Sequence, residues 1–131
     1  MPRGPAYGVG RREDDLVIGV AFFRKEVVEF ALGEQTRKAV DEQRAAIAAE
    51  PANPRPYHNL ALLYRLQDKP DEALGLLLEA VRLDPQFAEA HMALAEIYAV
   101  RGDMAAARRH AATAAARGAP QARQMLDRWE A

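Results

Sequence analysis

The chain has 131 residues, of which 50% are hydrophobic and 28% are charged, and its formal net charge is -1. This length suits one domain with a hydrophobic core, and the composition is typical of a soluble globular protein. The balanced charge gives no general attraction to nucleic acids or anionic membranes, so we expect neither as a partner. Because there is no cysteine, the sequence excludes disulfides, thiolate metal sites and cysteine nucleophiles.

The beginning of the sequence predicts a flexible arm followed by an apolar segment. Residues 1–13 are rich in glycine, proline and arginine and contain too little apolar surface to fold alone. They do not have the layout of a signal peptide. The longest apolar run, residues 16–23, is far shorter than the about 20 residues of a membrane-spanning helix. We therefore expect a cytoplasmic protein that does not insert into a membrane.

From residue 14 onward, turn residues divide the chain into seven predicted helices. Asp14 and Asp15 are suited to begin the first helix, and Gly33 is suited to end it. Proline, glycine, asparagine or aspartate separates the others, which are predicted over residues 34–50, 55–67, 71–83, 86–100, 104–117 and 121–131. Only the apolar run 16–23 is also compatible with a strand. The predicted fold class is therefore all-α.

Two successive helix pairs carry the same pattern of apolar residues, at a constant spacing that brings Tyr57 onto His91. In each first helix, a leucine and a tyrosine one turn apart form an apolar stripe, and in each second helix two alanines leave room for close crossing. A single pair cannot bury such a stripe, so neighbouring pairs must stack. The copies are Tyr57-x-x-Leu60-Ala61-x-x-Tyr64 with Ala73, Ala80 and Pro85, and His91-x-x-Leu94-Ala95-x-x-Tyr98 with Ala107 and Ala114.

This pattern resembles that of the tetratricopeptide-repeat (TPR) family. The resemblance implies antiparallel helix pairs stacked as a short right-handed α-solenoid, with repeats over residues 54–87 and 88–120. Residues 121–131 are then expected to form a C-terminal capping helix, because Met125, Leu126 and Trp129 lie at helical spacing. The whole TPR-like helical domain is predicted over residues 14–131.

Residues 14–53 are predicted to form a degenerate first repeat. A backward shift by the same spacing places two phenylalanines, two alanines and a proline in register with the repeat pattern: Phe23, Phe30, Ala39, Ala46 and Pro51. Glu26 and Gln43 depart from the pattern at positions that are normally apolar.

The resemblance also implies a function, because TPR proteins receive a segment of a partner in the concave groove formed by their first helices. We therefore expect a non-catalytic scaffold or adaptor for a protein or peptide partner. The residues that point away from the apolar stripe are predicted to line this groove. They are Arg55, His58, Asn59, Leu62, Arg65 and Leu66 in one helix, and Glu89, Met92, Ala93, Glu96, Ala99 and Val100 in the next.

This groove is predicted to have an apolar floor of Leu62, Leu66 and Met92, with a basic N-terminal end and an acidic opposite end. Alternatively, the four charged side chains form a solvated helix face on which they pair with one another: Arg55, Arg65, Glu89 and Glu96.

Some TPR domains clamp the C-terminal carboxylate of a partner with lysine, arginine and asparagine side chains. Here Asn59 matches the middle asparagine of that set, but the other positions fall on Arg24 and Val28 and on Glu89 and Ala93. An acidic residue in this place would repel a carboxylate. The sequence therefore argues against such a clamp.

The apolar segment near the N-terminus is a second candidate contact. If helical, it is apolar nearly all round, so it either packs into the degenerate repeat or docks on a partner. Docking would make the chain a structural subunit or assembly factor of a larger complex, or a self-associating protein. The residues of this contact are Leu16, Ile18, Phe22, Phe23, Arg24 and Lys25.

Catalysis has little support in the sequence. His91 occupies the place of an aromatic repeat residue, and His58 lacks a nucleophile or a carboxylate at ligand spacing. No metal-binding or phosphate-binding motif is present. We therefore expect no enzymatic activity, metal or cofactor.

Overall fold

The structure is a computed structural model, and it describes residues 32–130. The chain divides into two units, Met1–Arg37 and Lys38–Ala131. Within the described end of the first unit, the Thr36 hydroxyl donates to the Leu32 carbonyl oxygen at 2.7 Å. The predicted arm, and the predicted contact that includes Leu16, Phe22 and Lys25, lie outside the described residues.

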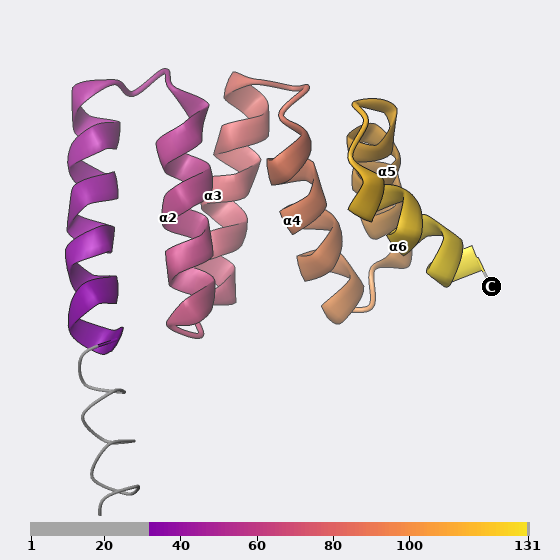
Figure 1. Ribbon diagram of the computed structural model, residues 1–131, viewed down its shortest axis with the longest axis horizontal. Coiled ribbons are helices and arrows are strands. Elements are labelled where there is room, and N and C mark those ends of the chain that lie inside the picture. Colours follow the sequence, from indigo (N-terminus) through magenta and orange to yellow (C-terminus); the bar gives the residue numbers. More distant parts are fainter. Residues whose placement is uncertain (1–31, 131) are drawn as a thin grey trace, which may run out of the picture. The chain divides into compact units, whose positions relative to one another are not determined.

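Residues 32–130 form six helices and contain no strand, which confirms the prediction of an all-α fold for this part of the chain (Figure 1). The helices cover residues 32–49, α2 (Pro54–Leu66), α3 (Pro70–Leu83), α4 (Ala88–Val100), α5 (Met104–Ala116) and α6 (Pro120–Glu130). From α2 onward, the predicted helix boundaries agree with the structure to within two residues.

The helix over residues 32–49 runs through Gly33, so the predicted helix end at this glycine is wrong. Glycine ends a helix where the backbone takes a positive φ. Among the described residues only Asp68, Gly102 and Gly118 do so. Inside a helix, glycine costs only about 1 kcal/mol relative to alanine, and this is too little to force a break.

Local side-chain and backbone interactions define the ends of the helices. Asn53 caps α2, because its side-chain oxygen accepts from the Arg55 amide at 3.1 Å. Asp103 caps α5 in the same way, through the Ala106 amide at 3.1 Å. Such caps satisfy amide groups that have no partner within the helix.

The turns after α2 and α4 occupy equivalent positions of the two repeats. Asp68 has a φ of 60° and Gly102 a φ of 88°. In both turns the following amide donates to a tyrosine carbonyl oxygen five residues earlier at 2.9 Å: Lys69 to Tyr64, and Asp103 to Tyr98. The same left-handed turn therefore closes both first helices.

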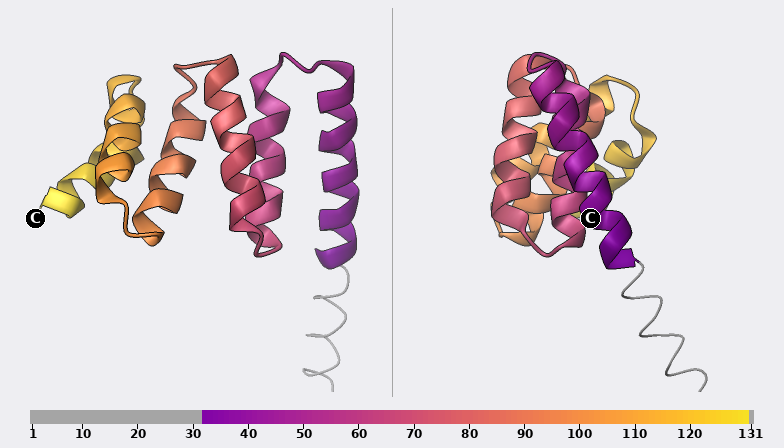
Figure 2. Two further views of the ribbon diagram at one scale, coloured as in Figure 1. Left: turned by 180° about the vertical axis from the view of Figure 1, so that it is seen from behind. Right: turned by 90° about the vertical axis from the view of Figure 1, so that its left-hand side faces the viewer.

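Helices α2 and α3 form one antiparallel pair, and α4 and α5 form the next (Figures 1 and 2). Leu60 and Leu94, the equivalent leucines of the two first helices, are 3% and 0% exposed. The second helices cross close by because their repeat alanines leave room for the neighbouring backbone. All four are buried, as the pattern predicts: Ala73, Ala80, Ala107 and Ala114.

Residues 38–49 pack on α2 through both apolar and polar contacts. Val40 is buried in the same core as Leu60, and Arg44 Nε donates to the Tyr64 hydroxyl at 3.2 Å. Gln43, which departs from the repeat pattern, accepts a hydrogen bond from the Asn59 amide at 3.4 Å. A polar contact thus takes the place that an apolar side chain usually fills.

Helix α6 covers the apolar side of α4 and α5. Its Met125 and Leu126 are buried in one cluster with Ala95 and Ala111, and Trp129 packs against this cluster. None of the helices within residues 32–130 combines the length and the apolarity needed to cross a bilayer.

Candidate functional site

The exposed sides of α2, α4 and α6 carry three neighbouring open cavities. The first, of about 420 Å³, is lined by Leu62, Arg65 and Leu66 of α2. The second, of about 170 Å³, lies between the C-terminal ends of α2 and α4 and includes Arg65 and Val100. The third, of about 400 Å³, lies between α4 and α6 and also includes Val100. Because neighbouring cavities share residues, we treat them as one α2/α4/α6 groove.

The floor of this groove contains large apolar side chains that are open to solvent. Leu62, Leu66 and Val100 are 39%, 77% and 88% exposed, and Met92 in the third cavity is half-buried. The structure therefore brings two of the three residues of the predicted floor, Leu62 and Leu66, together in one cavity, while Met92 lines another. Leu66 and Val100 occupy equivalent positions, each as the last residue of its helix.

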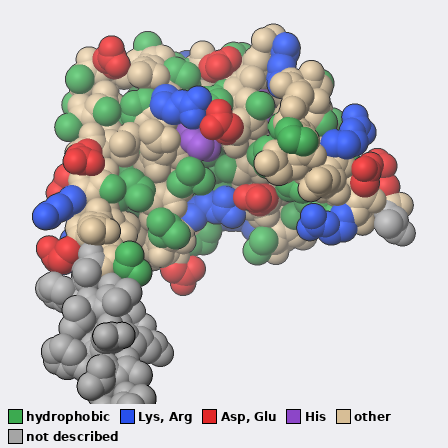
Figure 3. All heavy atoms as spheres, viewed as in Figure 1, with side chains coloured by type: hydrophobic (Ala, Val, Ile, Leu, Met, Phe, Trp, Pro, Cys, Tyr) green, Lys and Arg blue, Asp and Glu red, His purple; other side chains and the backbone are tan. Residues whose placement is uncertain are grey.

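Charged side chains along α2 and α4 pair with one another. Arg55 contacts Glu89 through two hydrogen bonds of 3.0 and 3.1 Å, and Arg65 donates to Glu96 at 2.9 Å. On this side of the molecule, basic and acidic side chains lie next to each other between hydrophobic ones (Figure 3). The two arginines lie on α2 and the two glutamates on α4, and the structure contains the mutual pairing that the sequence offered as an alternative.

The pair of Arg55 and Glu89 also perturbs the titration of both groups. Its hydrogen bonds lower the pKa of the Glu89 carboxyl and raise the pKa of Arg55. The Arg55 guanidinium lies 4.7 Å from the centre of the Phe87 ring, so the same side chain also makes a cation–π contact. Neither Arg55 nor Glu89 is among the residues that line the three cavities.

Two residues that were predicted to line the groove are buried instead. His58 is 6% exposed because Phe87, from the loop before α4, covers it; the two ring centres are 5.2 Å apart. Ala93 is 4% exposed because it belongs to the core cluster that contains Leu60 and Leu94. Burial lowers the pKa of His58 and favours the neutral ring, whose Nδ1 has no hydrogen-bond partner in residues 32–130.

The other two histidines form a packed pair between α4 and α5. His91 is 8% exposed, as expected for an aromatic repeat position, and its Nδ1 lies 2.9 Å from Nδ1 of His110. Its Nε2 lies 2.8 Å from the Pro85 carbonyl oxygen, and the ring of Tyr98 stacks on His110. No three histidine, aspartate or glutamate side chains within residues 32–130 are grouped as a metal site would require.

Asn59, the residue that matched the carboxylate clamp, lies half-buried with its amide directed to Gln43. Glu89 lies at a position where the clamp needs a basic residue, and it forms an ion pair with Arg55. These contacts leave neither residue arranged to receive a carboxylate.

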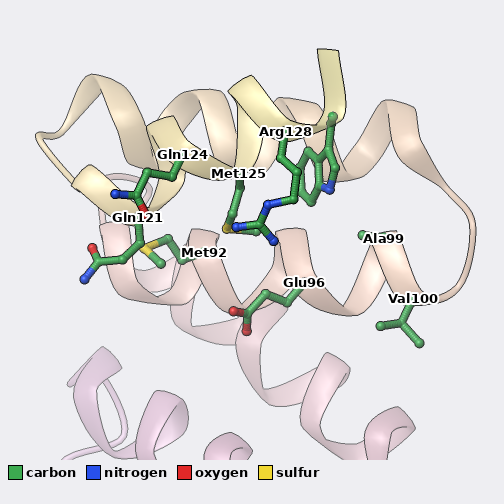
Figure 4. A pocket seen from close by; sticks show the side chains of 9 residues that line it. Met92, Glu96, Ala99, Val100, Gln121, Gln124, Met125 and Arg128 are labelled. Atoms are coloured by element: carbon green, nitrogen blue, oxygen red, sulfur yellow. The ribbon is translucent and has the colours of Figure 1, made fainter. Parts of the chain in front are cut away.

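Helix α6 contributes a wall of the groove that the sequence did not predict. Figure 4 shows Gln121, Gln124 and Arg128 on the α6 side of the third cavity, facing Met92 and Glu96 of α4. With a repeat spacing slightly shorter than the one between Tyr57 and His91, Gln124 becomes equivalent to Met92, and Arg128 becomes equivalent to Glu96. The apolar residues of α6 indicate only its buried face, so the sequence pattern does not point to these polar residues.

Comparison with known proteins supports this architecture. The family model of the tetratricopeptide repeat matches residues 54–97, which include α2, α3 and most of α4. The TPR repeat-containing thioredoxin TTL4 of Arabidopsis thaliana is 42% identical over 65 residues, or 50% of this chain and 10% of that protein. Tetratricopeptide repeat protein 36 of Caenorhabditis elegans is 41% identical over 59 residues, or 45% of this chain and 33% of that protein.

A similar arrangement of helices occurs in the crystal structure of MamA. The TM-score is 0.59 at 18% sequence identity, over 74% of this chain and 54% of that chain. The chain spans a tenth of the length of one curated relative and a third of the other. The predicted resemblance to the TPR family and the TPR-like fold are confirmed.

Proposed function

We propose that this chain, which carries the tetratricopeptide repeat over residues 54–97, is a non-catalytic scaffold that holds a segment of a partner protein in the α2/α4/α6 groove. The observation that carries the proposal is the exposure of Leu66 and Val100, which are 77% and 88% open to solvent at equivalent repeat positions. Leu66 and Val100 line neighbouring cavities of one groove, and a gathering of exposed apolar side chains along a groove favours a surface that a partner covers.

Binding of a partner would bury apolar surface that the free chain leaves exposed. Fully burying a leucine or valine side chain contributes about 1.5–3 kcal/mol. Leu66 and Val100 gain little of this energy in the free chain, so a partner that covers them gains most of it. The helices that carry them are fixed by buried leucines and alanines, and this reduces the ordering cost of binding.

The ion pairs along the groove limit which partners fit. Arg65 and Glu96 satisfy each other next to the apolar floor, so a partner does not need to neutralise either charge. Partner recognition in the first two cavities then depends on apolar side chains. A partner segment with bulky aliphatic or aromatic residues is the one that suits this floor.

Affinity capture with the full chain tests the proposal. We expect Leu66→Ala together with Val100→Ala to abolish capture of proteins that the unchanged chain retains. Leu78→Ala is the matched control, because Leu78 is also exposed, at 41%, but lies on α3 and lines none of the three cavities. Circular dichroism establishes that each variant is folded.

A third variant, without residues 1–24, separates the groove from the predicted N-terminal contact. If only this deletion loses the captured protein while the groove variant retains it, the groove proposal is overturned in favour of docking through the N-terminal segment. Loss in the groove variant alone, with the deletion and Leu78→Ala unaffected, is the result that we expect.

A further inference from the structure

We infer that the third cavity, between α4 and α6, selects partner segments in which an aspartate or glutamate side chain accompanies an apolar one, and that Arg128 is the residue that recognises the carboxylate. This inference rests on the proposed function, because it identifies the chemistry of the segment that the groove would hold. It derives from the charges that line the groove and from their pairing.

The groove contains three arginines, and two of them are neutralised by neighbours. Arg65 pairs with Glu96, and Arg101 pairs with Asp71. Arg128 is exposed and forms no ion pair with any residue from 32 to 130. Among the described residues that line the three cavities, its guanidinium is therefore the cation that remains available to a partner.

Glu96 lies in the same cavity but is already engaged. Arg65 Nη1 on α2 donates to Glu96 Oε1 at 2.9 Å, whereas Arg128 reaches the cavity from α6. The three charges thus alternate across three helices, from Arg65 on α2 through Glu96 on α4 to Arg128 on α6. One carboxylate between two cations leaves an excess positive charge, and a second carboxylate from the partner would balance it.

The remaining lining suits a polypeptide that carries both an acidic and an apolar side chain. Met92, Met125 and Trp129 provide thioether and indole surface, which adapts to side chains of different shapes. Gln121 and Gln124 are exposed, and their side-chain amides form no hydrogen bond within residues 32–130. These amides are therefore available to pair with the backbone of a partner.

The geometry favours an internal acidic residue over the C-terminal carboxylate of a partner. The third cavity is open and continues into the second through the shared Val100. A segment that follows the groove from α2 to α6 passes through the cavity and presents its side chains there, so its end does not need to stop beside Arg128.

A display library of random peptides selected on the full chain provides the test. Peptides selected on the unchanged chain are expected to be enriched in aspartate or glutamate next to bulky apolar residues. Against a selected peptide, Arg128→Glu is expected to weaken affinity about tenfold, because it replaces attraction with repulsion. Changing the acidic residue of that peptide to lysine is expected to restore binding to the Arg128→Glu chain.

Arg123→Glu is the matched control, since Arg123 is an exposed arginine of the same helix that does not line the cavity. Equal affinity of the Arg128→Glu and Arg123→Glu chains for the selected peptides, which still require Leu66, would overturn the inference and leave the proposed function standing. If no selected peptide depends on Leu66, the proposed function itself fails.

Discussion

Truncation of Leu66 to alanine should leave the fold almost unchanged, although leucine is normally a core residue. Leu66 is 77% exposed, so only about a quarter of its surface is removed from water on folding. Full burial of a leucine is worth about 1.5–3 kcal/mol, and the expected loss of unfolding free energy is therefore about 0.5 kcal/mol. Leu60 lies on the same helix but is 3% exposed, and Leu60→Ala should cost about 2–5 kcal/mol.

Urea unfolding followed by circular dichroism measures both values on the same scale. The two variants should have the same dependence of free energy on denaturant, because neither changes the surface exposed on unfolding by much. An equal loss of unfolding free energy in Leu66→Ala and Leu60→Ala would contradict this expectation. In that case Leu66 would be covered by another part of the molecule, and the groove floor would belong to the core.

Three further properties can be measured in the same way. Asp68→Gly should raise the unfolding free energy by about 1 kcal/mol, since it relieves a positive φ at a non-glycine residue; an unchanged value would show that this turn is not strained. Burial lowers the pKa of His58 and of His110 below the ordinary 6.5, so the unfolded chain binds more protons than the folded one as the pH falls through that value. The free energy of unfolding should therefore decrease as the pH falls from about 8 to about 5. The decrease should be less steep when both histidines are changed to glutamine. An equal slope in that variant would contradict the assignment to these histidines. A double-mutant cycle on Arg55 and Glu89, both more than half exposed, should give a coupling of about 0.2–1 kcal/mol that disappears in high salt. A coupling that persists in high salt would mean that the pair is shielded from solvent.

The sequence predicted the helices well because each carries its own local signals. Proline begins α2, α3 and α6, and apolar residues about one helical turn apart form the buried stripe. The helix end predicted at Gly33 is wrong because glycine is compatible with both a helix end and a helix interior. The choice depends on whether the chain turns there, and no local residue specifies that.

The groove was harder to predict because its lining depends on contacts between repeats. His58 points away from the stripe of its own helix, as the pattern required, yet Phe87 from the next repeat covers it. The pairing of Arg55 with Glu89 was one of the two alternatives that the sequence left open. The two residues are 34 positions apart, and stacked repeats place equivalent positions side by side.

The repeat translation explains why stability and recognition can be separated in this chain. It stacks Leu60 on the same side as Leu94, inside, and Leu66 on the same side as Val100, outside. Substitutions in the outer set can therefore change the partner at little cost to the fold. The pairing of charges along α2 and α4 ends at α6, where Arg128 lies in the same cavity as Glu96 without pairing with it. Recognition of a charged partner is consequently expected at this end of the groove, where the internal pairing stops.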